Sequence, residues 1–348
     1  MRTSLIVIVF VILLVAIGLA GFYAGQSLAP TTTVTVPSPT TYTYTSTFTS
    51  TLTQYVTSTT IPPNAIVKDP TPRIGIVIAM PNEAQYVFEV FNMEKTFEFM
   101  GYNFSTGTIA GKPVVIVISG IGEEAAAGAV IAMNTLFNVK WAVNIGTAGA
   151  HSYDHDTGDV IVGARIVPYG NRRYLSYENW TYMRLGITFA NGTWYRFLYL
   201  NASNYLLELA EKASREITLP PTPANLTGRN QTYYPKIYLN GTIASADIWT
   251  ANATYILRIH NELGTDAEEM EAYGFGLACY RLGIPFIKIA VISDSELTGS
   301  PWCPESIMVS MRNGVKLLVK MIELSDQFIF YGFLNPVVFQ TVITLSRF

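Results

Sequence analysis

The sequence predicts a layered α/β domain with a largely parallel sheet, placed behind an N-terminal membrane segment. Between residues 70 and 326, short β-branched runs alternate with helical segments, a pattern typical of a parallel sheet covered by helices. Ahead of this domain, residues 5–23 form a run of nineteen residues without a charge. The chain has 348 residues, ample length to bury a core in one or two domains.

The first segment, residues 1–29, is predicted to be a transmembrane helix. Nineteen residues at roughly 1.5 Å each nearly cross a hydrocarbon core about 30 Å thick. Arg2 and the amino terminus are the flanking charges, which predicts a cytoplasmic N-terminus and a domain outside the cell. The alternative is a signal peptide cleaved after Ser27-Leu28-Ala29, which would make the protein secreted.

Residues 30–69 are predicted to form an extracellular stalk. Residues 31–60 contain 15 Thr and 4 Ser, and no charged residue lies between Thr3 and Val67. A tract of this composition has no alternating apolar face and cannot build a core. We expect a solvated spacer that carries sugar on its hydroxyls or is an unmodified flexible linker.

The domain itself, residues 70–326, begins after Pro70-Thr71-Pro72. Continuous β-branched runs predict strands buried on both faces of a sheet, and apolar periodicity predicts the helices that cover it. The predicted strands are 73–80, 113–119, 141–145 and 285–292, and the predicted helices are 125–137, 205–216, 267–282 and 306–324.

Charge and cysteine content exclude several classes of protein. The chain has 22 basic and 25 acidic residues without a Lys/Arg cluster, which argues against a nucleic-acid partner. Charged residues make up 14% of the chain, fewer than in most cytosolic proteins. Two cysteines, Cys279 and Cys303, are too few for a disulfide scaffold, so they are either two buried thiols or one disulfide outside the cell.

N-glycosylation sequons support an extracellular domain. Eight are present where chance predicts about three, and all eight lie within the folded part. We expect them to mark exposed loops. The acceptor residues are Asn103, Asn179, Asn191, Asn201, Asn225, Asn230, Asn240 and Asn252.

Small and acidic residues follow the predicted strands. Glu83 follows the first strand, Ser119-Gly120-Ile121-Gly122 the second, Gly146-Thr147-Ala148-Gly149 the third and Ser293-Asp294 the last. In open α/β sheets, active groups lie where strands end and loops begin. These strand ends are therefore the candidate site.

At these positions the chain resembles the nucleoside phosphorylase and nucleosidase superfamily, most closely the 5′-methylthioadenosine/S-adenosylhomocysteine nucleosidases. The resemblance covers nearly all of residues 73–326 and implies a three-layer phosphorylase-like fold around a central mixed, largely parallel sheet. The matching stretches are IGIVIAMPNEA (74–84), VISGIGEEAAA (117–127), NIGTAGA (144–150), TGDVIV (157–162), SADIW (245–249), EMEAYGFGLAC (269–279) and IPFIKIAVISDSE (284–296).

The resemblance implies cleavage of an N-glycosidic bond by two carboxyl groups. Asp294 matches the acid that protonates purine N7, and Glu83 matches the carboxylate that activates water. Glu271 matches the group that binds the ribose hydroxyls, with Met270 against the sugar. A proton on the purine makes the base a leaving group, which is why such an acid is needed.

Smaller residues complete the implied site. Ser119 and the backbone through Gly122 would lie near the water or anion, and Gly146 near the substrate. Trp249 would stack on the base, although core packing explains it equally well. Ser293 would hold Asp294 in position.

Hydrolysis is favoured over phosphorolysis. Phosphorylases of this superfamily hold phosphate with an arginine after the first strand, whereas this turn reads Met80-Pro81-Asn82-Glu83. A carboxylate there would repel phosphate. The resemblance implies no cofactor and no metal, with phosphate as a co-substrate if the enzyme is a phosphorylase. Arg172 and Arg173 are interpreted as surface residues, and residues 151–156 (HSYDHD) as a polar loop rather than a metal site.

The apolar extension 327–348 is interrupted by Asn335-Pro336 and makes a poor transmembrane helix. It is predicted to form strands that pack on the domain or join a neighbouring subunit, so we expect a homo-oligomer or a polymer. The expected protein is a single-pass ectoenzyme of purine nucleoside salvage. The alternatives are a phosphate-dependent phosphorylase and a surface structural protein that reuses the fold.

Overall fold

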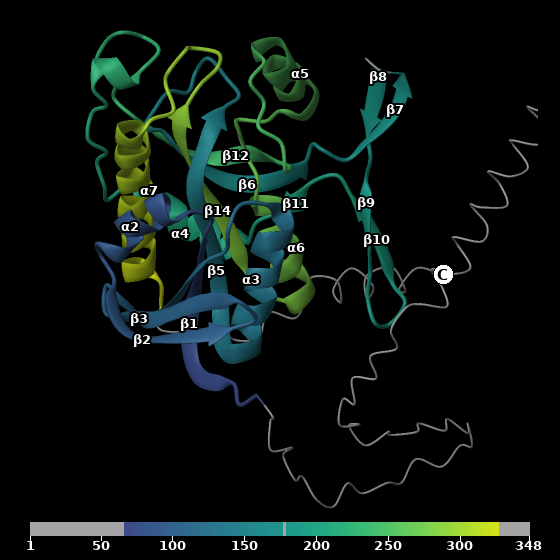
Figure 1. Ribbon diagram of the computed structural model, residues 1–348, viewed down its shortest axis with the longest axis vertical. Helices are drawn as coiled ribbons and strands as arrows, with labels where there is room; N and C mark the ends of the chain where they lie inside the picture. The colour runs from purple at the N-terminus through teal and green to yellow at the C-terminus, as the bar shows by residue number, and fades with distance from the viewer. Residues whose placement is uncertain (1–65, 177–178, 327–348) are drawn as a thin grey trace, which may run out of the picture. The chain divides into compact units, whose positions relative to one another are not determined.

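The computed structural model describes residues 66–176 and 179–326 (Figure 1). The predicted membrane helix 5–23, the stalk up to residue 65 and the extension 327–348 lie outside these residues. Within the described part of the chain, no helix has both the length and the apolarity needed to cross a membrane.

Ten strands form the central sheet, in the order β11-β6-β12-β13-β5-β1-β4-β3-β2, with β14 paired to both β5 and β6. The strands are β1 (Asp69–Ile78), β2 (Asn92–Phe99), β3 (Tyr102–Ile109), β4 (Lys112–Ile118), β5 (Phe137–Ala150), β6 (Val160–Pro168), β11 (Leu200–Asn201), β12 (Ile237–Ser245), β13 (Ala267–Glu269) and β14 (Phe286–Asp294).

The sheet is mixed, as predicted, but it is not largely parallel. Within this sheet of described strands, five pairings are parallel and five are antiparallel. β2, β3 and β4 form a meander through short turns, and β14 returns antiparallel to β6. Because β6, β12, β13, β5 and β14 pair in a ring, one end of the sheet closes on itself. This closure places the ends of β13 and β14 on either side of β5.

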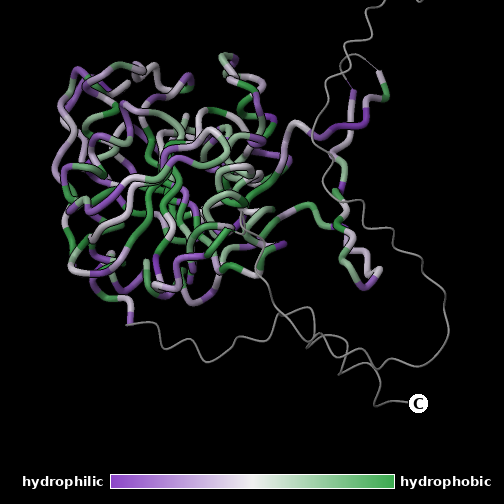
Figure 2. The backbone as a smooth tube through the Cα atoms, turned by 60° about the horizontal axis from the view of Figure 1, so that its bottom comes forward, coloured by the Kyte–Doolittle hydropathy of each residue, from purple (hydrophilic) through white to green (hydrophobic). Residues whose placement is uncertain are grey.

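Helices cover both faces of the sheet, so the three-layer prediction is confirmed. One apolar core joins the sheet to α2, α4 and α7, and a second joins it to α3 and α6 (Figure 1). Figure 2 shows hydrophobic stretches of the chain running through the middle of the described domain. The helices are α2 (Pro81–Phe88), α3 (Glu123–Leu136), α4 (Asn204–Ser214), α5 (Ala253–Leu263), α6 (Ala272–Leu282) and α7 (Pro304–Leu324).

The helix predicted over 267–282 is wrong in its first turn. Ala267–Glu269 form β13, and the helix α6 begins at Ala272. Ala267 pairs with Ile243 of β12 and Ala150 of β5, which fixes these residues as a strand. The Glu269 carboxylate then accepts hydrogen bonds from the Glu271 and Ala272 amides, which caps the helix at its true start.

Two hairpins lie within residues 164–243. They are β7 (Arg172–Ser176) with β8 (Asn179–Tyr182), and β9 (Leu185–Thr188) with β10 (Trp194–Phe197). Arg172 is not a plain surface residue: its guanidinium lies 4.9 Å from the Trp180 ring centre and 5.0 Å from that of Tyr255. This aromatic enclosure ties the β7–β8 hairpin to α5. Arg173 is exposed, as expected.

All eight sequon asparagines are exposed, as predicted. They do not all lie in loops, however. Asn103, Asn179, Asn201 and Asn240 lie in β3, β8, β11 and β12, at positions that face solvent. An outward-facing strand position leaves an asparagine as accessible as a loop does, which is why the sequon pattern could not distinguish them.

The possible disulfide is not formed, and both cysteines are free thiols. Cys279 lies fully buried in the core beneath α6. Cys303 precedes α7, where its Sγ accepts a hydrogen bond from the Ser306 amide. Each sulfur therefore has a separate structural role. The interpretation as two thiols rather than a disulfide holds, but only Cys279 is buried, because Cys303 is partly exposed.

Gly274 fixes the close approach of α6 to α3, which positions two site residues described below. A Cβ on Gly274 would clash with the backbone carbonyl of Glu123. We expect Gly274→Ala to lower the free energy of unfolding by about 3 kcal/mol, because a backbone clash can be relieved only by moving a helix. Gly128→Ala is the control, since its Cβ would meet the Tyr102 side chain. Chemical denaturation of both variants measures the difference, and equal losses would contradict this packing.

Candidate active site

A cavity opens where β1, β5, β13 and β14 end and α2 begins. Six carboxyl side chains line it together with the aromatic pair Trp249 and Trp302. No Lys or Arg is among the described residues of its wall. The carboxyl groups belong to Glu83, Glu268, Glu269, Glu271, Asp294 and Glu296.

Glu83 is held at the start of α2 by three hydrogen bonds. Its Oε1 accepts from the Thr147 amide and hydroxyl, both at 2.7 Å, and its Oε2 accepts from the Met80 amide at 3.1 Å. The side chain is 2% exposed. Burial raises the pKa of Glu83, while these hydrogen bonds and the charge of Lys288 oppose the rise. The carboxylate is thus fixed in place, with a pKa above its ordinary value.

Asp294 lies at the end of β14 and is oriented by its neighbour. The Ser293 hydroxyl donates to Asp294 Oδ1 at 2.6 Å. Burial, reinforced by the nearby Glu268 and Glu296 carboxylates, raises the pKa of Asp294 to about 6, and the bond from Ser293 opposes the rise. A carboxyl group with this pKa can donate a proton close to neutral pH.

Glu271 lies where α3 meets α6. Its Oε1 accepts from the Gly122 amide at 3.1 Å. Burial and the Glu269 carboxylate raise the pKa of Glu271 to about 7, and Lys288 opposes the rise. Met270, the residue before it, lines the cavity and is partly buried. The close packing at Gly274 therefore sets the position of this carboxylate.

Lys288, which the sequence analysis missed, supplies the positive charge that acts on the carboxylates of Glu83, Glu269 and Glu271. It is completely buried, with Nζ 3.0 Å from Glu269 Oε2 and 2.7 Å from Asn144 Oδ1. A buried lysine in a strand is unusual unless it is paired. The sequence signal that could have identified Lys288 is its position within an otherwise apolar strand, IPFIKIAVI.

Three predicted residues support the site without lining the cavity. The Ser119 hydroxyl donates to the Gly120 carbonyl at 2.8 Å rather than facing the cavity. Gly122 contributes its amide to Glu271. Gly146 leaves room for Glu83, because a Cβ there would lie 3.2 Å from Glu83 Oε1. The structure thus brings Glu83, Glu271 and Asp294 to one cavity and places these small residues behind them.

Trp249 is 60% exposed and lies at the cavity mouth, so core packing does not explain it. Its ring centre is 5.6 Å from that of Trp302, which the sequence analysis did not single out. The two rings are nearly perpendicular, at 73°. An exposed aromatic pair at a cavity mouth suits a planar or apolar ligand group.

Removing the indole should weaken substrate binding more than it slows chemistry. We expect Trp249→Ala to raise KM about tenfold with kcat changed less than threefold, because lost stacking affects ground and transition states alike. Trp194→Ala, on the β9–β10 hairpin and equally exposed, is the control. Steady-state kinetics of both variants test this, and a fall in kcat alone would contradict a stacking role.

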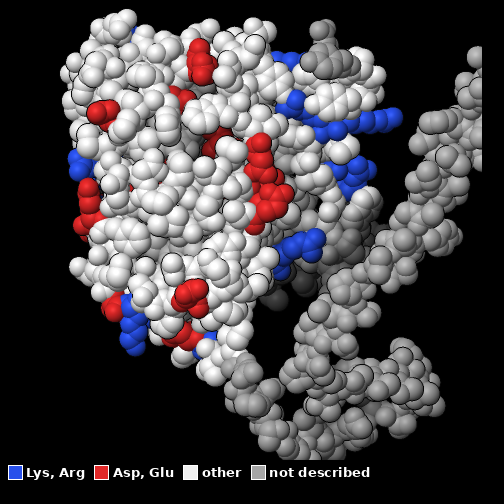
Figure 3. Space-filling view, in the orientation of Figure 1, with Lys and Arg blue, Asp and Glu red and all other residues white. Residues whose placement is uncertain are grey.

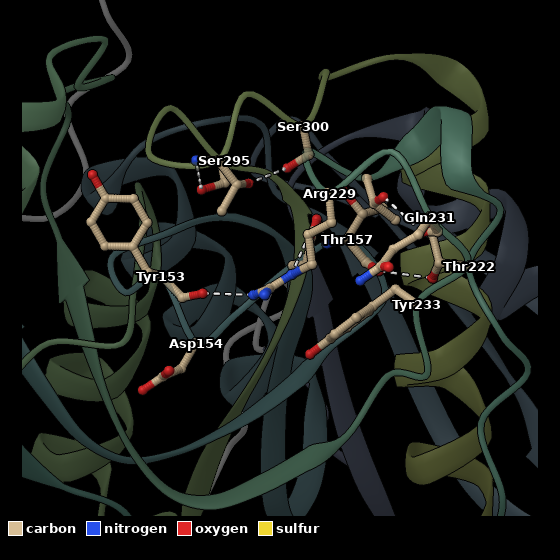
Figure 4. Close-up of polar contacts among 12 residues, drawn as sticks. Tyr153, Asp154, Thr157, Thr222, Arg229, Gln231, Tyr233, Ser295 and Ser300 are labelled. Carbon is tan, nitrogen blue, oxygen red and sulfur yellow. Dashed lines mark hydrogen bonds and ion pairs between the residues drawn. The ribbon is translucent and has the colours of Figure 1, made fainter.

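Residues 151–156 form a loop after β5, as predicted, in which Tyr153 and Asp154 are exposed. His151, His155 and Asp156 are all buried, and no group of metal-binding side chains occurs among the described residues. Asp156 pairs with Arg229 at 3.0 Å, and Arg229 also donates to the Tyr153 carbonyl at 2.6 Å (Figure 4). These contacts hold the segment around Arg229 against the loop after β5.

The same segment meets the loop that follows the acid. Gly228 lies so close to Thr298 that a Cβ would clash with its carbonyl. Figure 4 shows Ser295 and Ser300, whose bridge closes the 295–300 loop. The segment around Arg229 therefore packs against the chain just beyond Asp294.

Comparison with known proteins identifies the family. The phosphorylase superfamily model matches residues 73–324. The chain belongs to the phosphorylase superfamily. The family and the enzyme class predicted from the sequence, nucleosidase or nucleoside phosphorylase, are confirmed by this match and by the curated relatives. The match covers the described domain almost completely.

The curated relatives of this superfamily member are nucleosidases. A 5′-methylthioadenosine/S-adenosylhomocysteine nucleosidase of Psychromonas ingrahamii is 28% identical over 67% of this chain and 92% of its own. The solved nucleosidase of S. pneumoniae, with a transition-state inhibitor, has a TM-score of 0.56 and 23% identity over 72% of this chain and 98% of its own. Futalosine hydrolase of Helicobacter pylori has a TM-score of 0.55 and 21% identity over 73% and 98%. These structures share the fold.

Proposed function

We propose that this protein is a purine nucleosidase that hydrolyses the N-glycosidic bond. The observation that carries the proposal is the pair Asp294 and Glu83 in one cavity: an acid with a pKa near 6 and a fixed, buried carboxylate. An acid on the leaving base and a base on water are what glycosidic hydrolysis needs. The nucleosidase relatives support this assignment.

Asp294 supplies the proton to the base. In its neutral form, the Asp294 carboxyl group donates its proton to purine N7. When the C–N bond breaks, its electron pair moves to the base, which therefore leaves as a neutral purine. Ser293 holds Oδ1, which orients the other oxygen for donation. Bond cleavage leaves an oxocarbenium-like sugar.

Glu83 and Glu271 act on the sugar. Ionised Glu83 takes a proton from water as the water oxygen attacks C1′, and the Glu271 carboxyl group forms hydrogen bonds with the ribose hydroxyls. The negative charge of Glu83 stabilises the positive charge that develops on the sugar. The charge of Lys288 lowers the pKa of both carboxyl groups and so partly offsets the effect of burial.

Water is a better nucleophile here than phosphate. A phosphate dianion would enter a cavity whose wall holds six carboxyl groups. Among the described residues of that wall there is no Lys or Arg. Like charges within a few ångströms in a partly desolvated site repel by several kcal/mol. This argument favours hydrolysis over the phosphorylase alternative.

We propose further that the enzyme is anchored in the cell membrane with its domain outside. The apolar run 5–23, the uncharged tract 31–60 and the exposure of all eight sequon asparagines support this location. On the face drawn in Figure 3, most of the described surface carries no charge, which glycans on an extracellular domain would compensate. Peptide-N-glycosidase treatment of protein from its native cells tests this, with a mass decrease expected.

Release of free base tests the activity. Full-length protein incubated with methylthioadenosine, adenosine and inosine in phosphate-free buffer should release the base of at least one of them. Preparations inactivated by heat provide the blank. A protein that releases no base from any purine nucleoside, in buffer with or without phosphate, would contradict the proposal.

The pH dependence of kcat/KM should be bell-shaped with its optimum below neutrality. Asp294 acts in its protonated form, so activity falls as pH rises above about 6, by about tenfold per unit. Glu83 acts in its ionised form, so activity also falls at acid pH as Glu83 becomes protonated. Burial raises the pKa of Glu83 above its ordinary value of 4.5, so this fall begins at a higher pH than it would for a free glutamate. Ser293→Ala removes a bond that favours ionised Asp294 and should move the alkaline limb upward. An alkaline limb unmoved by this change would contradict the assignment of the acid.

A further inference from the structure

Lys288 is the central member of a chain of polar contacts that crosses the sheet beside the cavity. Its Nζ donates to Asn144 Oδ1 at 2.7 Å and lies 3.0 Å from Glu269 Oε2. Asn144 Nδ2 in turn donates to the Val77 carbonyl of β1 at 3.0 Å. Asn144 also pairs along the backbone with Val77 on one side and with Lys288 on the other. One ammonium and one amide side chain therefore connect β1, β5, β14 and β13.

At the β13 end of this chain of contacts, Lys288 fixes the start of α6. The Glu269 carboxylate caps this helix, because its Oε2 accepts from the Glu271 amide at 3.2 Å and from the Ala272 amide at 2.9 Å. Lys288 Nζ contacts the same oxygen and so holds the carboxylate in the orientation that the cap requires. The lysine therefore positions Glu271 through the cap of its helix.

Lys288 also faces the carboxylate of Glu83. Lys288 pairs with Asn144 on β5, and Gly146 follows on the same face two residues later, roughly 7 Å along the strand. The Glu83 carboxylate occupies the space over Gly146, where a Cβ would lie 3.2 Å from Glu83 Oε1. Burial raises the pKa of Glu83, and the charge of Lys288 opposes this rise. One cation thus acts on both carboxyl groups that contact the sugar.

The elements packed around Lys288 leave it room and bring it acidic partners. Gly163 of β6 lies opposite, where a Cβ would be 3.1 Å from Lys288 Cβ. Helix α7 packs on the other face of β14, where Gly314 lies against Val291. Three carboxyl groups interact with the ammonium, and they belong to Glu83 of α2, Glu269 of β13 and Glu271 at the start of α6.

We propose that Lys288 is a positioning residue for hydrolysis, whose ammonium stabilises the negative charge of Glu83 and fixes the helix cap that carries Glu271. This inference rests on the proposed nucleosidase function. Lys288 is not among the described residues that line the cavity, so it acts through these carboxyl groups rather than on the substrate. Without its charge, Glu83 would bind a proton at higher pH. Because Glu83 acts ionised and Asp294 acts protonated, only the acid limb of the pH profile should then move.

Lys288→Met tests this role, because methionine keeps the length of the side chain and removes its charge. We expect the acid limb of kcat/KM to move upward by about one pH unit, which is a loss of about tenfold at acid pH. The alkaline limb, which reports Asp294, should stay in place. Lys316→Met removes an exposed lysine from α7 and is the matched control, with both limbs expected at their wild-type positions.

A double variant guards against loss of folding, since Lys288→Met alone leaves the buried Glu269 carboxylate without its partner. Combining Lys288→Met with Glu269→Gln removes both charges of the pair. The glutamine oxygen can still accept from the Ala272 amide, so the cap of α6 is retained. This double variant should show the same upward movement of the acid limb, because the charge that acts on Glu83 is still missing.

Infrared difference spectra between each full-length protein and its Glu83→Gln counterpart follow the titration of Glu83 without turnover. They separate failure of this inference from failure of the proposed function: a Glu83 titration moved upward by Lys288→Met supports the role of Lys288 even if no bond is cleaved. An unmoved titration would overturn the proposal. So would an acid limb that stays in place in both Lys288 variants, or a loss of activity that is equal at every pH, which would make Lys288 a purely structural residue.

Discussion

Asp294→Asn should lower kcat about 1,000-fold, since a missing general acid typically costs 10²–10⁴ in rate. The asparagine has the same shape, and its carbonyl oxygen can still accept from Ser293. What it lacks is a proton that can be transferred to the leaving base. Steady-state assay of base release measures this loss.

The same substitution should stabilise the protein at neutral pH, which separates lost chemistry from lost folding. Because the pKa of Asp294 is raised to about 6 in the folded state, its contribution to stability is present at low pH and is lost as pH rises through 6. A neutral amide avoids this loss, so we expect about 2 kcal/mol of added stability at pH 7. Asp154→Asn, at an exposed position, is the matched control and should change neither property. An Asp294→Asn enzyme with activity within tenfold of wild type would contradict the assignment.

Glu83→Gln should lower kcat about 100- to 1,000-fold by removing the group that activates water. Binding of free base should remain, because the base lies at the other end of the cavity, near Asp294. The glutamine oxygen can still accept from Thr147, but its amide would meet the Met80 amide, so about 1 kcal/mol of stability should also be lost. Kinetics together with calorimetric binding of the base separate these effects.

Glu89→Gln is the control for this change. Glu89 lies just after α2, is exposed and pairs with Arg312 on the surface. It should keep full activity. Retained hydrolysis in Glu83→Gln, or loss of base binding together with kcat, would show that Glu83 has a structural rather than a catalytic role.

The strands that carry the site could be predicted because their sequences are extreme. Runs such as PVVIVIS and PFIKIAVI have one plausible environment, the inside of a sheet, and β4 and β14 are found there. The short polar strand β13 could not be predicted in this way. Its three residues are a strand because β12 and β5 lie beside them, which is tertiary information.

The candidate site shows the same division. Glu83, Glu271 and Asp294 could be found because they follow recognisable strands and motifs. Glu268 and Lys288 could not be found in this way, because only their burial distinguishes them. A lysine and a glutamate are ordinary in sequence and become unusual only when a closed sheet surrounds them. Trp302 belongs to the cavity because a loop after β14 brings it beside Trp249.

The sugar product of the reaction tests the central claim, hydrolysis at a carboxylate-lined site, most directly. Full-length protein should be incubated with the nucleoside it cleaves fastest, with and without phosphate, and the sugar identified by mass spectrometry. We predict free pentose at the same rate in both conditions, because water is the nucleophile and the cavity wall repels phosphate. Pentose 1-phosphate that forms only when phosphate is added would contradict this account and remove the role of Glu83 as the base that activates water.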